Sequence, residues 1–257
     1  MIEKNKLISR YEKILSDYQI NLKDCKILDF GCGSGDKVRS FRSLNYDAFG
    51  CDFKFKEGIL DYQNSDNTMN NNHDQDFLKL IPQDGDYELP YNDNSFNLIY
   101  SEQVFEHVMN YSETLIEQSR ILNDNGCVIH VFPSKFRIFE GHIKVPFSSI
   151  LSHKIWLYFW AIIGFRIREQ KDLTIYELVQ ENFNFLNNRT NYMSKKDLKN
   201  HFYKAFNYVE FIEGPWIKHS RKLPKILNNK YILNIISRFY STFRSRVVLM
   251  SNKEFKR

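Results

Sequence analysis

Residues 27–36 read ILDFGCGSGD, and this stretch decides the fold. A strand-like apolar run leads into Gly31, Gly33 and Gly35, and helical spacing begins at about residue 34. Glycine lets the chain turn tightly and lets a ligand lie against bare backbone amides. The stretch therefore predicts a buried strand, a ligand-binding turn and a helix, in that order.

The ligand that this turn predicts is a cationic nucleoside rather than a diphosphate. A dinucleotide fingerprint needs glycine where this chain has Asp36, and no GK[ST] follows to make a P-loop. The Asp29 carboxylate before the turn would repel a pyrophosphate and favours a cation. Asp52 ends the next expected strand, where a carboxylate can hold both hydroxyls of a ribose.

Apolar strand-like runs alternate with helical periods along most of the chain. This alternation predicts a doubly wound, mostly parallel sheet with helices on both faces and a last strand inserted antiparallel. The expected strands are residues 26–31, 46–52, 95–101, 126–132, 208–214 and 247–253. The expected helices are 34–44, 111–122, 193–202 with Ser194 as N-cap, and a basic segment over 221–244.

Composition limits the class of protein. The 257 residues fit one domain with an insertion, and 42% hydrophobic residues can build a sizeable core. Four cysteines without a CxxC pair indicate reduced thiols, and the N-terminus lacks the apolar run of a signal peptide, so we expect a cytoplasmic protein. The net charge of +5 is too mild for a dedicated nucleic-acid binder.

Further segments make the prediction more specific. In chain order they are FGCD, LPYNDNSFNLIYS, VFEHV and RILNDNGCVIHVFPS, which with ILDFGCGSG span about residues 26–134. This ordered set resembles the class I S-adenosylmethionine-dependent methyltransferases, near the type 11 group. The resemblance implies a Rossmann-like seven-stranded fold, S-adenosyl-L-methionine as cofactor and S-adenosyl-L-homocysteine as product.

The resemblance also implies roles for residues of the cofactor site. Gly31, Cys32 and Gly33 would line the methionine part, with Asp29 and Gly35 at the two ends of the turn; Asp52 would hold the ribose; Phe53, Asp86 and Tyr87 would surround the adenine; Ser101 and Glu102 would border the sulfonium. Two departures stand out. Asn97 replaces the usual Asp of the fourth strand, and a shorter loop leaves Asp84 as an alternative to Asp86.

Two histidines are candidates for a general base that removes a proton from an alcohol acceptor. Glu106 and His107 follow the strand of residues 95–101, at the mouth of the expected site, although His107 could simply pack against the next helix. Similar pairs hold magnesium in quinone O-methyltransferases together with an earlier Glu, but that position is Gln103 here, which argues against a metal. His142 is the second candidate.

Residues 134–190 are aromatic-rich and longer than an ordinary connection, so we expect an acceptor-binding helical lid inserted in a single domain of residues 1–257. Their EGHI stretch resembles the insertion of bacterial methyltransferases that tailor capsule or lipopolysaccharide precursors. Lys135, Arg137 and Lys144 could meet the phosphate of a nucleotide-linked or phosphorylated glycan, or form a solvated face. A sugar hydroxyl or a phosphate-type group is the expected acceptor; a quinone, lipid or other small molecule, an RNA, and a non-catalytic role are the alternatives.

Two segments bear on partners. The run IWLYFWAIIGF, residues 155–165, predicts a buried lid helix, with contact to a membrane or a lipid-linked substrate as the alternative. Residues 1–217 hold 25 Lys+Arg and 30 Asp+Glu, whereas residues 218–257 hold 11 and one. This basic segment could face an anionic acceptor, a membrane surface, a second subunit of a homodimer or a nucleic acid.

Overall fold

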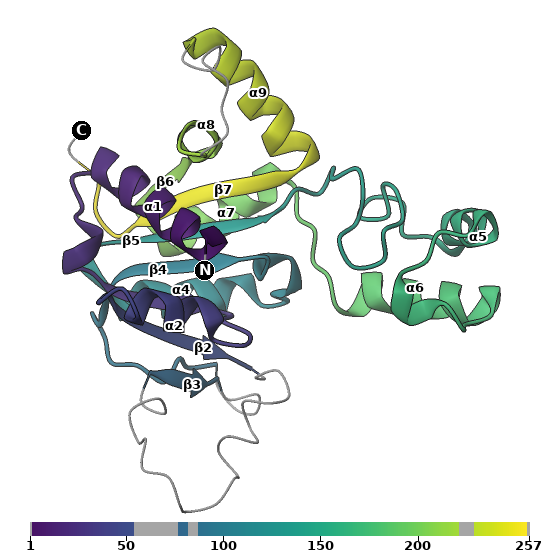
Figure 1. Cartoon of the computed structure of the whole chain (residues 1–257), viewed down its shortest axis with the longest axis horizontal. Coiled ribbons are helices and arrows are strands. Elements are labelled where there is room, and N and C mark those ends of the chain that lie inside the picture. The colour runs from purple at the N-terminus through teal and green to yellow at the C-terminus, as the bar shows by residue number, and fades with distance from the viewer. Residues whose placement is uncertain (1, 54–76, 82–86, 221–228, 256–257) are drawn as a thin grey trace, which may run out of the picture.

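The computed structural model describes residues 2–53, 77–81, 87–220 and 229–255. These residues form a seven-stranded sheet in the order β3-β2-β1-β4-β5-β7-β6 (Figure 1). The strands are β1 (Lys26–Phe30), β2 (Asp47–Asp52), β3 (Leu78–Leu80), β4 (Phe96–Glu102), β5 (Leu122–Pro133), β6 (Tyr208–Phe211) and β7 (Ser245–Ser251). β7 runs antiparallel to both β5 and β6, and the other pairs are parallel. The predicted fold class is confirmed.

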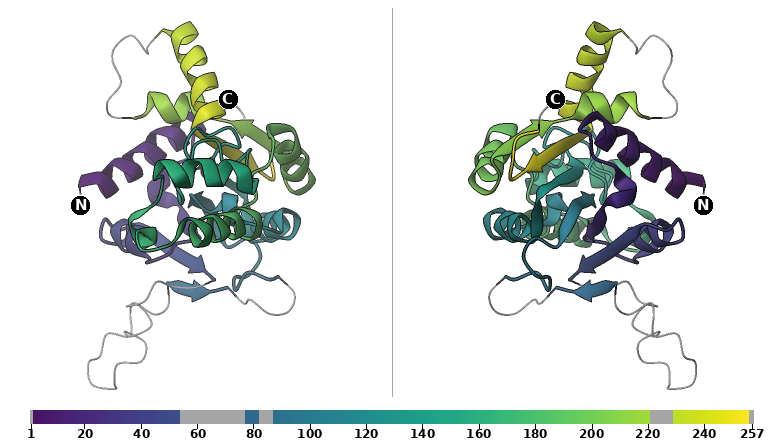
Figure 2. Two further views of the ribbon diagram at one scale, coloured as in Figure 1. Left: turned by 90° about the vertical axis from the view of Figure 1, so that its right-hand side faces the viewer. Right: turned by 90° about the vertical axis from the view of Figure 1, so that its left-hand side faces the viewer.

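Helices cover both faces of the sheet, as Figure 2 shows. One face packs against α1 (Ile2–Asp17), α2 (Asp36–Arg42) and α8 (Glu213–Lys218), and the other against α4 (Tyr111–Ile121) and α7 (Lys195–Ala205). Ser194 caps α7, as predicted, by accepting a hydrogen bond from the Asp197 N–H. The central strands β1, β4, β5 and β7 are buried on both faces, which explains why they are apolar runs without polar alternation.

The predicted boundaries hold with small shifts. The strand expected over 208–214 ends at Phe211, because α8 begins at Glu213. The basic helix expected over 221–244 is α9 (Lys230–Phe243), and residues 221–228 lie outside the described residues. All four cysteines are free and buried, in line with the prediction.

Residues 134–190 contain α5 (Lys154–Ile163), the short helix η3 (Arg168–Gln170) and α6 (Ile175–Asn188). α5 and α6 pack on each other beside the sheet and enclose their own hydrophobic cluster (Figure 1). Only one face of α5 is used, since Leu157 and Ala161 are buried while Ile155 is 80% exposed and Ile162 is 69% exposed. The prediction of a buried lid helix was therefore wrong. In a unit of two helices, α6 covers one side of α5 and the other side stays exposed to solvent.

No helix among the described residues has both the length and the apolar content needed to cross a bilayer.

Candidate functional site

The glycine turn begins where β1 ends. Gly31, Gly33 and Gly35 have φ angles of +76°, +55° and +71°, which L side chains adopt only with strain. A Cβ on Gly31 would lie 2.5 Å from a Val104 methyl carbon, whereas a Cβ on Gly33 would meet nothing within 4 Å. Gly31 is thus required by packing, while Gly33 leaves an open cradle in which a ligand can approach the backbone.

Asp52 fixes this turn to the neighbouring strand. Its Oδ2 accepts a hydrogen bond of 2.7 Å from the Gly33 N–H. The amides of Gly31 and Cys32 also donate to the Cys51 carbonyl, at 2.8 and 3.0 Å. The carboxylate therefore stands at the carboxyl end of β2 beside the cradle, as its spacing from the glycines predicts.

A cavity of about 430 Å³ opens at this edge of the sheet. Of the predicted site residues it is lined by Gly31, Asp52, Phe53, Tyr87 and His107. The Phe53 and Tyr87 rings lie 6.1 Å apart and supply aromatic surface for a base, while Asp52 supplies a carboxylate for ribose hydroxyls. These features fit an adenosine-containing cofactor. Asp84 and Asp86 lie outside the described residues.

Six other predicted cofactor residues of the described part of the chain do not line this cavity: Asp29, Cys32, Gly33, Gly35, Ser101 and Glu102. Ser101 is buried in the sheet, and its Oγ donates to His130 Nδ1 at 2.8 Å. Glu102 forms a 2.7 Å ion pair with Lys37. Burial raises the pKa of Asp29 to about 7, even though Lys37 nearby lowers it. Cys32 is buried, with its Sγ facing the Cα of Gly50. Asp29, Glu102 and Lys37 thus form a charged cluster beneath the turn.

Gly35, the last predicted turn residue, is the N-cap of α2, and a Cβ there would lie 2.7 Å from a Leu78 methyl carbon. Its role is to let β3 approach the turn.

His107 lies in the short helix η2 (Phe105–His107) directly after β4. Its Nδ1–H donates a hydrogen bond of 2.7 Å to the Arg189 carbonyl, since a carbonyl can only accept. This bond leaves Nε2 as the proton acceptor. Burial lowers the pKa of His107 below 6.5, although the bond to Arg189 opposes the shift. His107 is therefore neutral at physiological pH, in the tautomer that a general base needs.

His142 is held by the buried carboxylate of Glu140. Its Nδ1–H donates to Glu140 at 2.9 Å and its backbone N–H at 2.6 Å. The Ile143 N–H and the Tyr192 hydroxyl donate to the same carboxylate, each at 2.8 Å. Burial opposes the charge of Glu140, but these bonds together hold its pKa at about 2. The hydrogen bond to Glu140 in turn raises the pKa of His142.

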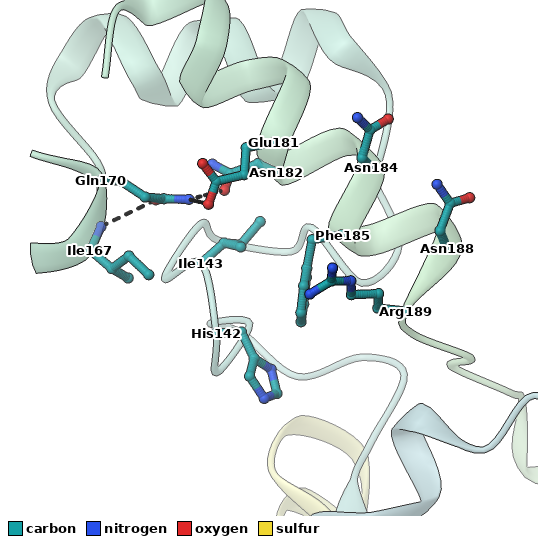
Figure 3. A pocket seen from close by; sticks show the side chains of 10 residues that line it. All are labelled: His142, Ile143, Ile167, Gln170, Glu181, Asn182, Asn184, Phe185, Asn188 and Arg189. Atoms are coloured by element: carbon teal, nitrogen blue, oxygen red, sulfur yellow. Dashed lines mark hydrogen bonds between the residues drawn. The ribbon is translucent and has the colours of Figure 1, made fainter. Parts of the chain in front are cut away.

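The structure brings the two histidines together. Their ring centroids are 4.8 Å apart, and Phe185 of α6 packs 5.0 Å from the His142 ring. His107 lines the cavity at the glycine turn, while His142 lines a second cavity of about 870 Å³ (Figure 3). The histidine pair therefore joins a residue of the first cavity's lining to a residue of the second cavity's lining.

The second cavity is rich in polar side chains. It is lined by His142, Ile143, Ile167, Gln170, Glu181, Asn182, Asn184, Phe185, Asn188 and Arg189. Figure 3 shows that most of these side chains come from α6 and the loop around His142. Gln170 donates to Glu181 at 3.2 Å and to Asn182 at 2.8 Å, which orders one wall. Amides and a guanidinium suit a ligand with several hydroxyl or phosphate oxygens.

Glu106 is buried at 2% exposure, and neither carboxylate oxygen has a hydrogen-bond partner among the described residues. Burial raises its pKa to about 7, although His142 and Arg137 lie near enough to lower it. The predicted catalytic residues Glu106, His107 and His142 thus form one cluster. Sequence reasoning missed Tyr192, Phe185 and Arg189, which complete this cluster from 40 or more residues further along the chain and carry no motif of their own.

Within residues 2–53, 77–81, 87–220 and 229–255, no group of three or more His, Cys, Asp or Glu side chains is arranged to hold a metal ion.

Comparisons with known proteins found one family model and several solved structures that are similar to this chain. Residues 28–130 match the family model described as a methyltransferase domain. A methyltransferase dependent on S-adenosylmethionine from Mesorhizobium loti is 13% identical, with 94% of this chain and 97% of that chain covered and a TM-score of 0.49. Geranyl diphosphate C-methyltransferase from Streptomyces coelicolor is also 13% identical, with 97% and 80% covered and a TM-score of 0.47. No curated protein matches.

The matched segment contains the glycine turn, and its residues Gly31, Asp52, Tyr87 and His107 line the first cavity. Residues 28–130 are thus similar to a methyltransferase domain, and the cavity beside the glycine turn suits S-adenosyl-L-methionine as cofactor.

Proposed function

We propose that the protein is an O-methyltransferase that acts on a sugar hydroxyl or a phosphate-type group of a capsule or lipopolysaccharide precursor. The position of the histidine pair carries this proposal, because His107 faces the cofactor cavity and His142 faces the polar cavity. An oxygen acceptor in the polar cavity would reach the cofactor cavity past a group that can take its proton.

The two histidines have different roles in this proposal. S-adenosyl-L-methionine supplies an electrophilic methyl group when bound and leaves as S-adenosyl-L-homocysteine. His107 Nε2 takes the proton of the acceptor hydroxyl, since its lowered pKa keeps it neutral. His142, whose pKa the hydrogen bond to Glu140 raises, orients a hydroxyl or a phosphate oxygen. Glu106 lies behind the pair and adjusts its charge.

Residues 134–190 form the acceptor-binding insertion within one domain of residues 1–257 in this proposal. α5 and α6 have their own hydrophobic cluster, and α6 supplies much of the polar cavity wall. Arg189 lines the cavity, and Arg137 lies near Glu106 and His142, so both are placed to meet a phosphate. A nucleotide-linked or phosphorylated glycan fits these groups.

The experiment is a methyl-transfer assay with nucleotide sugars and phosphorylated sugars as acceptors, with mass spectrometry of the product to locate the new methyl group. Loss of a general base typically slows the step by about 10²–10⁴-fold, which is the expected loss for His107→Ala. His201→Ala, a histidine of α7 outside both cavities, is the matched control. Methylation of nitrogen or carbon, or undiminished turnover in both His107→Ala and His142→Ala, would overturn the proposal.

A further inference from the structure

α9 packs on the body of the protein through its small polar side chains. Ser241 is buried, and a Cβ on Gly214 of α8 would lie 3.4 Å from the Ser237 hydroxyl oxygen. Gly214 therefore allows α9 to approach α8 through its serine side. Tyr240 also packs against the main hydrophobic cluster, so the side of α9 that faces the body combines serine side chains with an aromatic ring.

The apolar side of α9 faces solvent. Tyr231 is 81% exposed, Ile235 57%, Phe239 63% and Phe243 41%. These four residues are spaced by four along the helix and form one stripe. Figure 1 shows α9 rising away from the sheet, and the exposed fractions show that the described part of the chain leaves the stripe largely uncovered. We call Tyr231, Ile235, Phe239 and Phe243 the α9 stripe.

The α9 stripe continues toward the acceptor insertion. Arg244 ends α9, and its carbonyl accepts a hydrogen bond of 3.1 Å from the Ser134 N–H, where the insertion begins. Just beyond lie Phe136 and Phe139, which are 44% and 51% exposed. The segment that begins beside the end of α9 thus also carries exposed apolar side chains.

Charge identifies what covers this surface. Residues 218–257 hold 11 Lys+Arg and one acidic residue, and Lys230, Arg238 and Arg244 are exposed on or beside α9. A second copy of the chain docked through the same stripe would bring two strongly basic segments face to face, which is electrostatically costly. An anionic lipid surface satisfies both the apolar stripe and the basic residues around it.

We propose that α9 lies on the surface of an anionic membrane, with the α9 stripe at the level of the lipid headgroups and its basic residues against the lipid phosphates. This docking goes beyond methyl transfer and does not rest on the identity of the acceptor. It would place the acceptor insertion next to the lipid surface.

The test is co-sedimentation of the full chain with vesicles of phosphatidylcholine alone or mixed with phosphatidylglycerol. Burying one large apolar side chain is worth about 1.5–3 kcal/mol, so the double variant Ile235→Glu/Phe239→Glu should bind the anionic vesicles at least about tenfold more weakly. Ile116→Glu is the matched control, because Ile116 of α4 is also 57% exposed. Wild-type binding should weaken as salt is added.

Failure of the wild type to bind anionic vesicles, or equal loss in the double variant and in Ile116→Glu, would overturn the proposal. So would sedimentation equilibrium that shows a dimer which the double variant dissociates, because the stripe would then face a second copy. Calorimetric titration with S-adenosyl-L-methionine tests whether a loss of vesicle binding is independent of cofactor binding. The double variant should keep the wild-type cofactor affinity.

Discussion

Replacing the buried Glu106 by Gln should stabilise the protein above neutral pH. Burial without a hydrogen-bond partner raises the pKa of Glu106 from 4.5 to about 7, so the fold favours the protonated carboxyl. A group whose pKa is raised on folding costs nothing below pH 4.5, and its cost grows as the pH rises toward 7. Each pKa unit is worth about 1.4 kcal/mol, which gives a cost of roughly 3 kcal/mol above pH 7.

Urea denaturation of the wild type and of Glu106→Gln across this pH range measures the difference directly. The two proteins should have similar free energies of unfolding near pH 4.5, and the variant should become more stable by up to about 3 kcal/mol near pH 8. Asp29 has a similarly raised pKa, but it is present in both proteins and cancels. Glu88→Gln, at an exposed position, is the control. A difference that does not change with pH, or a variant less stable near pH 8, would refute the reasoning.

Three further results are expected. The kcat/KM of methyl transfer should rise with pH through an apparent pKa below 6.5, as the lowered pKa of His107 requires; a midpoint above 6.5 would move the base role to His142. Gly33→Ala should abolish cofactor binding in calorimetry, whereas Gly164→Ala, which has the same open surroundings and a positive φ, should lose only about 1 kcal/mol of stability. Glu140→Gln should lower the pKa of His142 in an NMR titration. An unchanged pKa would show that the Glu140 carboxylate does not hold the His142 ring.

Local backbone demands made the cofactor turn predictable from sequence. Positive φ angles at Gly31 and Gly33 need glycine, and the parallel pairing of β1 and β2 brings Asp52 to the Gly33 amide. Both features depend on residue types that stand at a fixed spacing in the sequence. The strands were predictable for a similar reason, because a parallel sheet buried on both faces requires apolar runs.

The acceptor side was less predictable, because it depends on contacts across long stretches of chain. His107 and His142 are separated by the whole of β5, and the Arg189 carbonyl that orients His107 comes from the end of α6. Ser101 and Glu102 were expected beside the sulfonium, but their side chains are engaged by His130 and Lys37. Neither partner is recognisable from local sequence.

The solvent exposure of the apolar sides of α5 and α9 could not be predicted from the sequence pattern either. The run that forms α5 is apolar around most of its circumference, so its composition favours burial. In the described part of the chain, α5 packs on α6 and on the loop that holds Ile143 and Val145, while Ile155 and Ile162 on its other side stay exposed. α9 shows the same effect with the α9 stripe.

Calorimetric titration of S-adenosyl-L-methionine into the wild type, Asp52→Ala and Asp47→Ala tests the central claim most directly. The wild type should bind one molecule per chain. Hydrogen bonds to a charged group are worth about 1.5–3 kcal/mol, so Asp52→Ala should weaken binding by at least about tenfold. Asp47→Ala, at the exposed start of the same strand, should bind like the wild type. Equal affinity in the wild type and Asp52→Ala would contradict the assignment of the cofactor site.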